Sequence, residues 1–193
     1  MATKKVFIVH GWSGHPEDDW FPWLKKELES LGYEVHVPQM PDTDQPRMQI
    51  WVPALAQSVG IPDENTYFVG HSMGCKTIAC YLETLSDNIK VGGVVFVAGF
   101  FKRLTLDPDD DINTASVCLE FPVDFEKIHS HLPRSIAIFS DDDPYVPLDN
   151  QDDFRDKLGS QIVIQHGHRH FNVGAGFYTL PIALEKLLEL AKD

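Results

Sequence analysis

The sequence predicts a three-layer α/β/α fold built on a mainly parallel sheet of about six strands. Short apolar segments rich in β-branched residues alternate with longer segments of helical period. Several apolar segments, among them residues 6–9 and 94–97, are apolar at successive positions, which is typical of strands that helices cover on both faces. The length of 193 residues suits one well-buried core, so we expect a single domain over residues 1–193.

The expected elements alternate between strand and helix along the chain. A first helix carries Trp20 to Leu31, with Asp18 or Asp19 as its possible N-cap. A second helix opens at Pro46, and Pro53 marks its kink or premature end. The expected strands are residues 6–10, 34–37, 66–70, 91–98, 135–139 and 161–164, and the remaining helices are residues 72–86, 149–158 and 177–191.

Residues 100–134 are the least regular part of the sequence. Their charge run, residues 107–111, is typical of a solvated loop, and the segment leaves little material for a lid. In repeated strand–helix units with right-handed crossovers, ligands bind beyond the carboxyl ends of the strands. We therefore expect the functional residues in the loops that follow strands.

The charge balance excludes several classes of partner. Sixteen Lys and Arg against 29 Asp and Glu give a net charge of −13, which repels nucleic acids and anionic lipid surfaces. Cys75, Cys80 and Cys118 lack zinc-site spacing, and the apolar run near the start is too short for a signal peptide or a membrane span. We expect a cytoplasmic protein that takes a small neutral ligand and needs no cofactor or metal.

The motif Gly70-His71-Ser72-Met73-Gly74 follows a predicted buried strand and opens a predicted helix. This context is that of the G-x-S-x-G nucleophile elbow, in which a sharp turn presents the serine hydroxyl. The glycines avoid collisions at that turn, and His71 is expected to be structural. The motif predicts Ser72 as a nucleophile.

A serine nucleophile needs a general base that a carboxylate orients. Asp141, Asp142 and Asp143 follow a later strand, and we favour Asp143 because Pro144 restricts its backbone. The segment after the last strand holds three histidines, and spacing alone does not choose among His166, His168 and His170. A competing interpretation takes these three histidines as metal ligands, because alternate residues of an extended segment point to one side.

The loop after the first strand, His10-Gly11-Trp12-Ser13-Gly14, carries glycines where peptide N–H groups can face a developing oxyanion. We expect the N–H groups of Trp12 and Met73 to form this oxyanion hole. His10, Gly11, Trp12 and Phe100 are the expected walls of a substrate pocket near Ser72, since they lie at or just after the ends of strands.

With these motifs in place, the chain resembles the small α/β-hydrolase family of retinoblastoma-binding protein 9 and bacterial YdeN-type proteins. The resemblance spans the whole chain and is carried by His10-Gly11-Trp12, Trp20-Phe21-Pro22-Trp23-Leu24, Pro38-Gln39-Met40-Pro41, Gly70-His71-Ser72-Met73-Gly74-Cys75, Asp143-Pro144 and His170-Phe171-Asn172. It implies a compact serine hydrolase with a reduced sheet and a minimal lid. The implied triad is Ser72, Asp143 and His170, although Gly167-His168 places a second histidine near the base and leaves His168 open.

The resulting hypothesis is a serine hydrolase that cleaves a small carboxylic ester or an amide through an acyl-enzyme. A short lid favours short-chain esters. The alternative is a weakly catalytic or non-catalytic binding protein with the same fold. The L-x-C-x-E pattern that binds the retinoblastoma pocket is absent, since Val117-Cys118-Leu119-Glu120 has different spacing, and the protein partner stays unknown.

Overall fold

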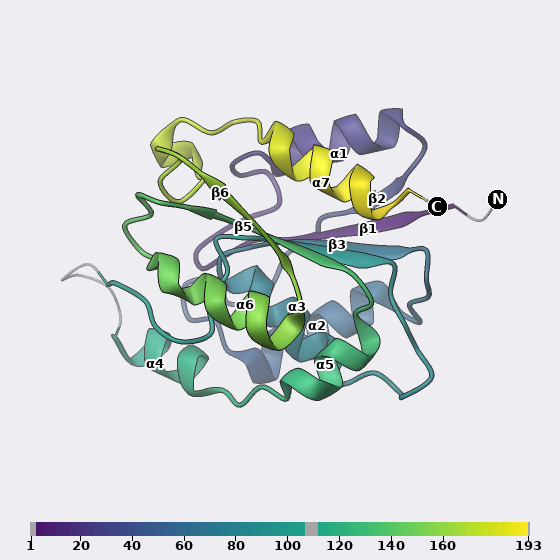
Figure 1. Cartoon of the computed structure of the whole chain (residues 1–193), viewed down its shortest axis with the longest axis horizontal. Coiled ribbons are helices and arrows are strands. Elements are labelled where there is room, and N and C mark those ends of the chain that lie inside the picture. Colours follow the sequence, from purple (N-terminus) through teal and green to yellow (C-terminus); the bar gives the residue numbers. More distant parts are fainter. Residues whose placement is uncertain (1–2, 107–111, 193) are drawn as a thin grey trace.

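Six parallel strands form one sheet in the order β2-β1-β3-β4-β5-β6, in a computed structural model that describes residues 3–106 and 112–192 (Figure 1). The strands are β1 (Lys5–Val9), β2 (Glu34–His36), β3 (Thr66–His71), β4 (Gly93–Val97), β5 (Ser135–Ser140) and β6 (Gln161–Gln165). Every residue of β3, β4 and β5 is buried, whereas the edge strands β2 and β6 are partly exposed. The predicted fold class and its mainly parallel sheet are confirmed.

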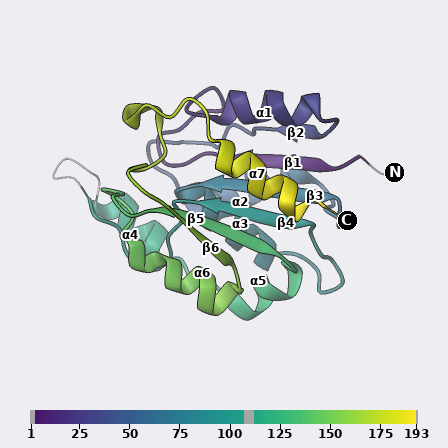
Figure 2. The same cartoon turned by 45° about the horizontal axis from the view of Figure 1, so that its top comes forward.

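Helices cover both faces of the sheet, and Figures 1 and 2 show the same two layers from different directions. One face carries α1 (Phe21–Ser30) and α7 (Pro181–Leu190). The other carries α2 (Met48–Val59), α3 (Met73–Glu83), α4 (Ile112–Glu120), α5 (Phe125–His131) and α6 (Gln151–Leu158). Two short 3₁₀ segments, Leu148–Asn150 and Val173–Ala175, lie in the loops beyond β5 and β6.

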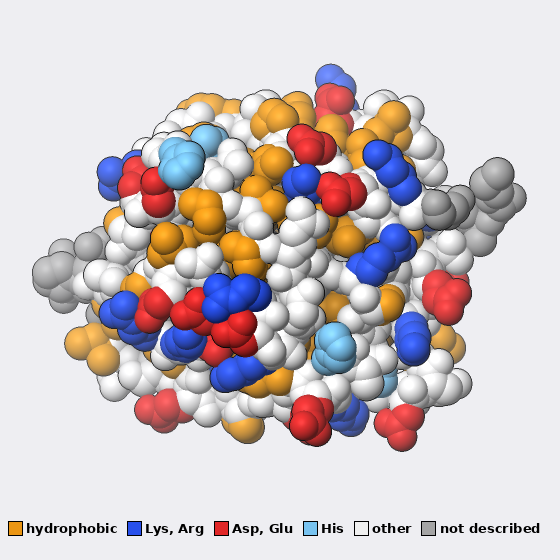
Figure 3. Space-filling view, in the orientation of Figure 1, with side chains coloured by type: hydrophobic (Ala, Val, Ile, Leu, Met, Phe, Trp, Pro, Cys, Tyr) orange, Lys and Arg blue, Asp and Glu red, His pale blue; other side chains and the backbone are white. Residues whose placement is uncertain are grey.

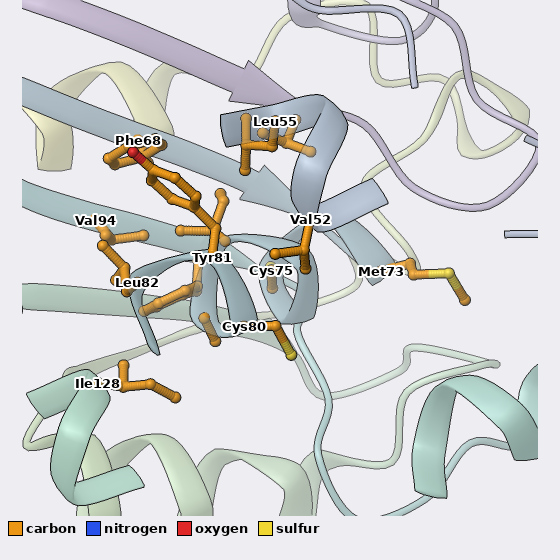
Figure 4. Packing of buried hydrophobic residues seen from close by; sticks show 14 of the residues in the cluster. Val52, Leu55, Phe68, Met73, Cys75, Cys80, Tyr81, Leu82, Val94 and Ile128 are labelled. Carbon is orange, nitrogen blue, oxygen red and sulfur yellow. The ribbon is translucent and has the colours of Figure 1, made fainter. Parts of the chain in front are cut away.

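Two apolar clusters fill the spaces between the sheet and its helical layers. In Figure 4, Tyr81 of α3 lies against Phe68 of the sheet, and Val52 and Leu55 of α2 belong to the same cluster as Val94 of the sheet. Full burial of a large apolar side chain contributes about 1.5–3 kcal/mol, so these clusters hold the layers together. Figure 4 also places Met73 at the edge of its cluster, beyond the strand ends.

Several helix ends differ from the sequence expectations. Pro53 lies inside α2, and the helix continues to Val59. The last helix begins at Pro181, not at residue 177. Asp18 and Asp19 do not cap α1: the residue at its N-cap is Trp20, and no side chain caps it. Both aspartates instead accept hydrogen bonds from loop N–H groups, so the expectation that they cap the helix was wrong.

The segment expected to be irregular contains two helices, α4 and α5. Helix α4 buries only Thr114, Ala115 and Cys118, and this sparse set gives no clear apolar period in the sequence. Both helices lie in the layer below the sheet. The predicted loop at residues 107–111 lies outside the described residues.

Charged side chains of both signs gather over α6, as Figure 3 shows. Arg155 pairs with Asp152 and Asp156, and Lys157 pairs with Asp153. The pairs of Arg155 are exposed and contribute little to stability, whereas Asp153 is itself buried. Because carboxylates neutralise these cations, this surface does not form a basic patch.

The start of α3 lies against the end of β1. A Cβ atom added at Gly74 would be 2.1 Å from the Val9 carbonyl oxygen and 2.7 Å from that of His10. Both oxygens are backbone atoms, so they cannot move aside without distorting the chain. Only glycine fits at this point of the fold.

We expect Gly74→Ala to lower the free energy of unfolding by about 3 kcal/mol, because the added methyl group forces α3 away from β1. Urea unfolding measures the change. Gly174→Ala is the matched control, since its Cβ would meet Asn172 Oδ1 at an ordinary 3.5 Å. Equal unfolding midpoints for the two variants would contradict the steric argument.

Candidate active site

Ser72 occupies a strained turn between β3 and α3. Its φ is 52° and its ψ is −118°, and its N–H donates to the Val97 carbonyl oxygen at 2.8 Å. A positive φ costs a non-glycine residue of order 1–3 kcal/mol and persists only where the surroundings enforce it. A Cβ at Gly70 would lie 2.8 Å from the Cys75 nitrogen, so the turn also requires glycine there.

The loop after β1 contacts the Ser72 side chain. A Cβ at Gly11 would be 3.1 Å from Ser72 Cβ and 3.6 Å from Ser72 Oγ. The loop is held from outside by two hydrogen bonds, from Ser13 N–H to the Thr43 oxygen at 2.8 Å and from Trp12 Nε1 to the Asp44 oxygen at 3.1 Å.

Ser72 lies in a cavity of about 630 Å³ beyond the carboxyl ends of the strands. Trp12 and Met73 line this cavity, and no described residue accepts a hydrogen bond from the peptide N–H of either. The peptide N–H groups of two residues that line the same cavity as the serine therefore have no acceptor among the described residues. Phe100 also lines the cavity, as does Gly11.

His10 does not line this cavity, and its expected place in the pocket was wrong. Its ring is fully buried, Nε2 accepts from Met40 N–H at 3.1 Å, and Nδ1 donates to the Gly11 oxygen at 2.9 Å. Burial lowers the pKa of His10. Its ring hydrogen bonds anchor the loop to the segment at Met40.

The predicted acid and base are paired. Asp143 Oδ2 accepts a hydrogen bond from His170 Nδ1 at 2.8 Å, and Oδ1 accepts from the N–H groups of Tyr145 and Val146 at 2.9 and 3.0 Å. The Asp143 side chain is 2% exposed, and that of His170 is 11% exposed. A neutral imidazole that donates from Nδ1 carries its lone pair on Nε2, so His170 can accept a proton there. His170 lines the same cavity as Ser72.

The competing carboxylates have other partners. Asp141 pairs with His166 Nδ1 at 2.6 Å and accepts from Gly167 N–H at 3.0 Å. Asp142 Oδ1 accepts from Ser140 Oγ and Arg169 N–H, both at 2.7 Å. Of the three aspartates, Asp143 is the one whose carboxylate meets His170.

The three histidines of the last loop do not converge. His166 is exposed and meets Asp141, while the His168 ring stacks on Phe177 at 4.8 Å and does not line the cavity. The part of the chain that the structure describes contains no group of three or more metal-ligating side chains. This arrangement gives the metal interpretation no support.

The cavity has acidic and apolar walls that sequence reasoning missed. Asp18, Asp19 and Asp44 line it, and no Lys or Arg does so among the described residues. Leu104 and Leu106, which follow Phe100 in the sequence, also line the cavity. Tyr145 also lines it, with its ring edge-on to that of His170 at 5.2 Å.

Asn150 explains why the segment after β4 forms a wall. It is fully buried, its Oδ1 accepts from the N–H groups of Phe101 and Lys102 at 3.1 Å, and its Nδ2 donates to the Arg103 oxygen at 3.0 Å. Thr105 N–H then donates to the Tyr145 oxygen at 2.7 Å. These contacts join segments 40 to 49 residues apart, which periodicity does not detect. The position of Tyr145, two residues after Asp143, was the usable signal.

Strained backbone gathers at the site. The described non-glycine residues with positive φ include Ser13, Asp19 and Ser72, which line the cavity, and Arg169 and Phe171, which flank His170. Such strain is a common property of functional sites.

No helix in the described part of the chain combines the length and apolar character needed to cross a membrane.

Comparison with known proteins identifies the family of the chain. Residues 6–189 match the family model described as serine hydrolase, and the chain belongs to the serine hydrolase family. YdeN of Bacillus subtilis (strain 168) is 36% identical over 187 residues, covering 96% of this chain and 95% of YdeN. Serine hydrolase RBBP9 of Rattus norvegicus is 30% identical over 173 residues, covering 88% of each chain. The resemblance stated from the sequence is confirmed.

Solved structures confirm the fold. The crystal structure of the ydeN gene product from B. subtilis has a TM-score of 0.91 at 32% identity and covers 99% of this chain and 100% of that one. Est1E from Butyrivibrio proteoclasticus has a TM-score of 0.72 at 16% identity and covers 98% of this chain and 89% of that one. The second likeness shows the shared fold alone.

The pKa of His71 differs between the folded and the unfolded protein, so measurements of unfolding free energy at different pH values can detect it. Burial, together with the charge of the neighbouring His170, lowers the pKa of His71 from 6.5 to about 3. The unfolded chain therefore takes up this proton first as the pH falls. The stability that neutral His71 provides is present above pH 6.5 and is lost progressively towards pH 3.

Between pH 7 and pH 5, we expect the parent protein to lose about 2 kcal/mol more unfolding free energy than His71→Gln, which has no group titrating at this position. Urea unfolding at both pH values gives the two differences. Taking the difference between the proteins removes the contribution of the other ionisable groups. Identical losses in the two proteins would show that His71 titrates normally.

Proposed function

We propose that this protein is a serine hydrolase that cleaves small carboxylic esters, with Ser72 as nucleophile, His170 as general base and Asp143 as its orienting acid. One observation carries the proposal: Asp143 holds His170 through Nδ1, and His170 shares one cavity with a serine in the strained elbow conformation. Nucleophilic serine catalysis needs these three groups in this relation.

The reaction begins when Ser72 Oγ attacks the ester carbonyl carbon and its proton passes to His170 Nε2. Asp143 keeps the proton on Nδ1 and stabilises the imidazolium that forms. The carbonyl oxygen becomes an oxyanion, which the N–H groups of Trp12 and Met73 stabilise, at about 3–4 kcal/mol for one such donor. Met73 N–H is also at the N-terminus of α3, where the helix dipole favours negative charge.

Collapse of the intermediate breaks the ester C–O bond. The His170 imidazolium gives its proton to the leaving alkoxide, which departs as an alcohol and leaves an acyl group on Ser72. Water then attacks the acyl carbon while His170 takes one of its protons. Release of the carboxylic acid returns that proton to Ser72.

The cavity walls support a small neutral substrate. Leu104, Leu106 and Phe100 offer an apolar surface of limited extent, and Asp18, Asp19 and Asp44 disfavour a substrate that carries its own carboxylate. The same geometry also suits an amide, with an amine as the leaving group. We favour esters because an alkoxide is the better leaving group.

A fluorophosphonate probe tests the nucleophile. We expect one covalent adduct on Ser72 in the parent protein, because the oxygen of an activated serine displaces fluoride from the probe and is phosphonylated, and none on Ser72→Ala. Intact mass and peptide mapping locate the adduct. Ser72→Ala should unfold like the parent and lose at least about a thousandfold in kcat. A folded parent protein that stays unlabelled would refute the proposal and leave a binding role for the fold.

The activity towards esters of different acyl chain length tests which substrates the cavity takes. Across a series of p-nitrophenyl esters, we expect kcat/KM to be highest for acyl chains of about two to four carbons, because the apolar wall that the described residues Phe100, Leu104 and Leu106 give the cavity is short. Initial rates at one enzyme concentration give the profile. A maximum at twelve carbons or more would contradict it.

A further inference from the structure

His71 connects the nucleophile strand to the base loop. It ends β3, directly precedes Ser72, and is 4% exposed. Its Nε2–H donates to the backbone oxygen of His170 at 2.8 Å, and the two imidazole rings lie 4.9 Å apart at a tilt of 45°. One side chain next to the nucleophile therefore contacts the base through both its backbone and its ring.

The base loop depends on contacts from outside its own sequence. Arg169 and Phe171 have φ values of 46° and 54°, which a loop of non-glycine residues does not hold unaided. Trp20 Nε1 donates to the Phe171 oxygen at 2.9 Å, and Asp19 Oδ1 accepts from Val173 N–H at 2.6 Å. Together with the bond from His71, these contacts fix residues 170–173, and His71 is the member of this group that bonds to His170 itself.

The charge state of His71 suits this role. Asp19 Oδ2 lies 3.9 Å from His71 Nδ1, too far for a hydrogen bond, and burial holds the pKa of His71 at about 3. His71 is therefore neutral at the pH where a histidine base works. A charged ring at 4.9 Å would oppose protonation of His170, and a neutral one does not.

We propose that His71 is a positioning residue for the base: its Nε2–H holds the His170 carbonyl, and through it sets the direction of the His170 ring towards Ser72. The inference rests on the proposed roles of Ser72 and His170. A positioned base matters because small displacements of a reacting group cost large factors in rate. A merely structural His71 would contribute to folding and leave the turnover of the folded enzyme unchanged.

Two substitutions separate the hydrogen bond from packing. His71→Phe keeps a ring against Trp20 and Phe21, whose rings lie 5.9 and 6.0 Å from that of His71, but has no donor. His71→Gln loses the ring, and its side-chain amide nitrogen reaches the position of Nε2. The phenylalanine variant should therefore lose positioning, and the glutamine variant should restore it.

We expect His71→Phe to lower kcat for p-nitrophenyl acetate about tenfold or more, which corresponds to the loss of about one buried hydrogen bond, with KM changed less than about twofold. His71→Gln should retain kcat within about threefold of the parent. The rate of fluorophosphonate labelling of Ser72 should follow kcat in all three proteins. His71→Asn, which is smaller and does not reach the His170 oxygen, gives the same comparison if the phenylalanine variant does not fold.

The outcomes are distinct. A parent protein that neither labels nor turns over overturns the proposed function, and the inference with it. A parent that turns over while His71→Phe matches its kcat overturns the inference alone. Equal losses of kcat in the phenylalanine and glutamine variants also overturn it, because they would assign the effect to ring packing and not to the donor.

Discussion

The close contact between the start of α3 and the end of β1 is the constraint on which the rest of the site depends. Gly74 lies directly on the carbonyl groups of Val9 and His10, and the chain can enter α3 at this distance only through the strained turn at Ser72. The same contact brings the loop after β1 to the serine, with Gly11 against its side chain. The buried central strands make this geometry rigid, because none of their residues can shift without opening the core.

The sequence was sufficient for the fold and for the residues that short motifs carry. Continuous apolar runs identify strands covered on both faces, and a glycine-flanked serine between a strand and a helix identifies an elbow. Helix α4 was not predicted from the sequence because it buries small and polar residues, so its sequence lacks an apolar stripe. His10 was misplaced because an adjacent pair of residues in a loop can point in opposite directions, which only the contact with Met40 reveals.

Cavity walls were the least predictable part of the site. Leu104 and Leu106 reach the cavity because Asn150, nearly 50 residues further on, binds the backbone of their segment. The partner of Asp19 was also not predictable from the sequence. Its place before a helix indicates a helix cap, yet its carboxylate accepts a hydrogen bond from Val173 N–H, 154 residues away. Interactions between distant loops follow from the folded arrangement and have no local pattern.

The acidic loop after β5 and the histidine loop after β6 extend the pairing of their strands through side chains. The strands end in register at Ser140 and Gln165, after which Asp141 binds His166 and Gly167, Asp142 binds Arg169, and Asp143 binds His170. The residues after β5 thus pair in chain order with the loop after β6, in which Gly167 and His168 lie between the first and second pairs. Deletion of one residue in either loop would shift these pairs relative to one another, so the lengths of the two loops are coupled.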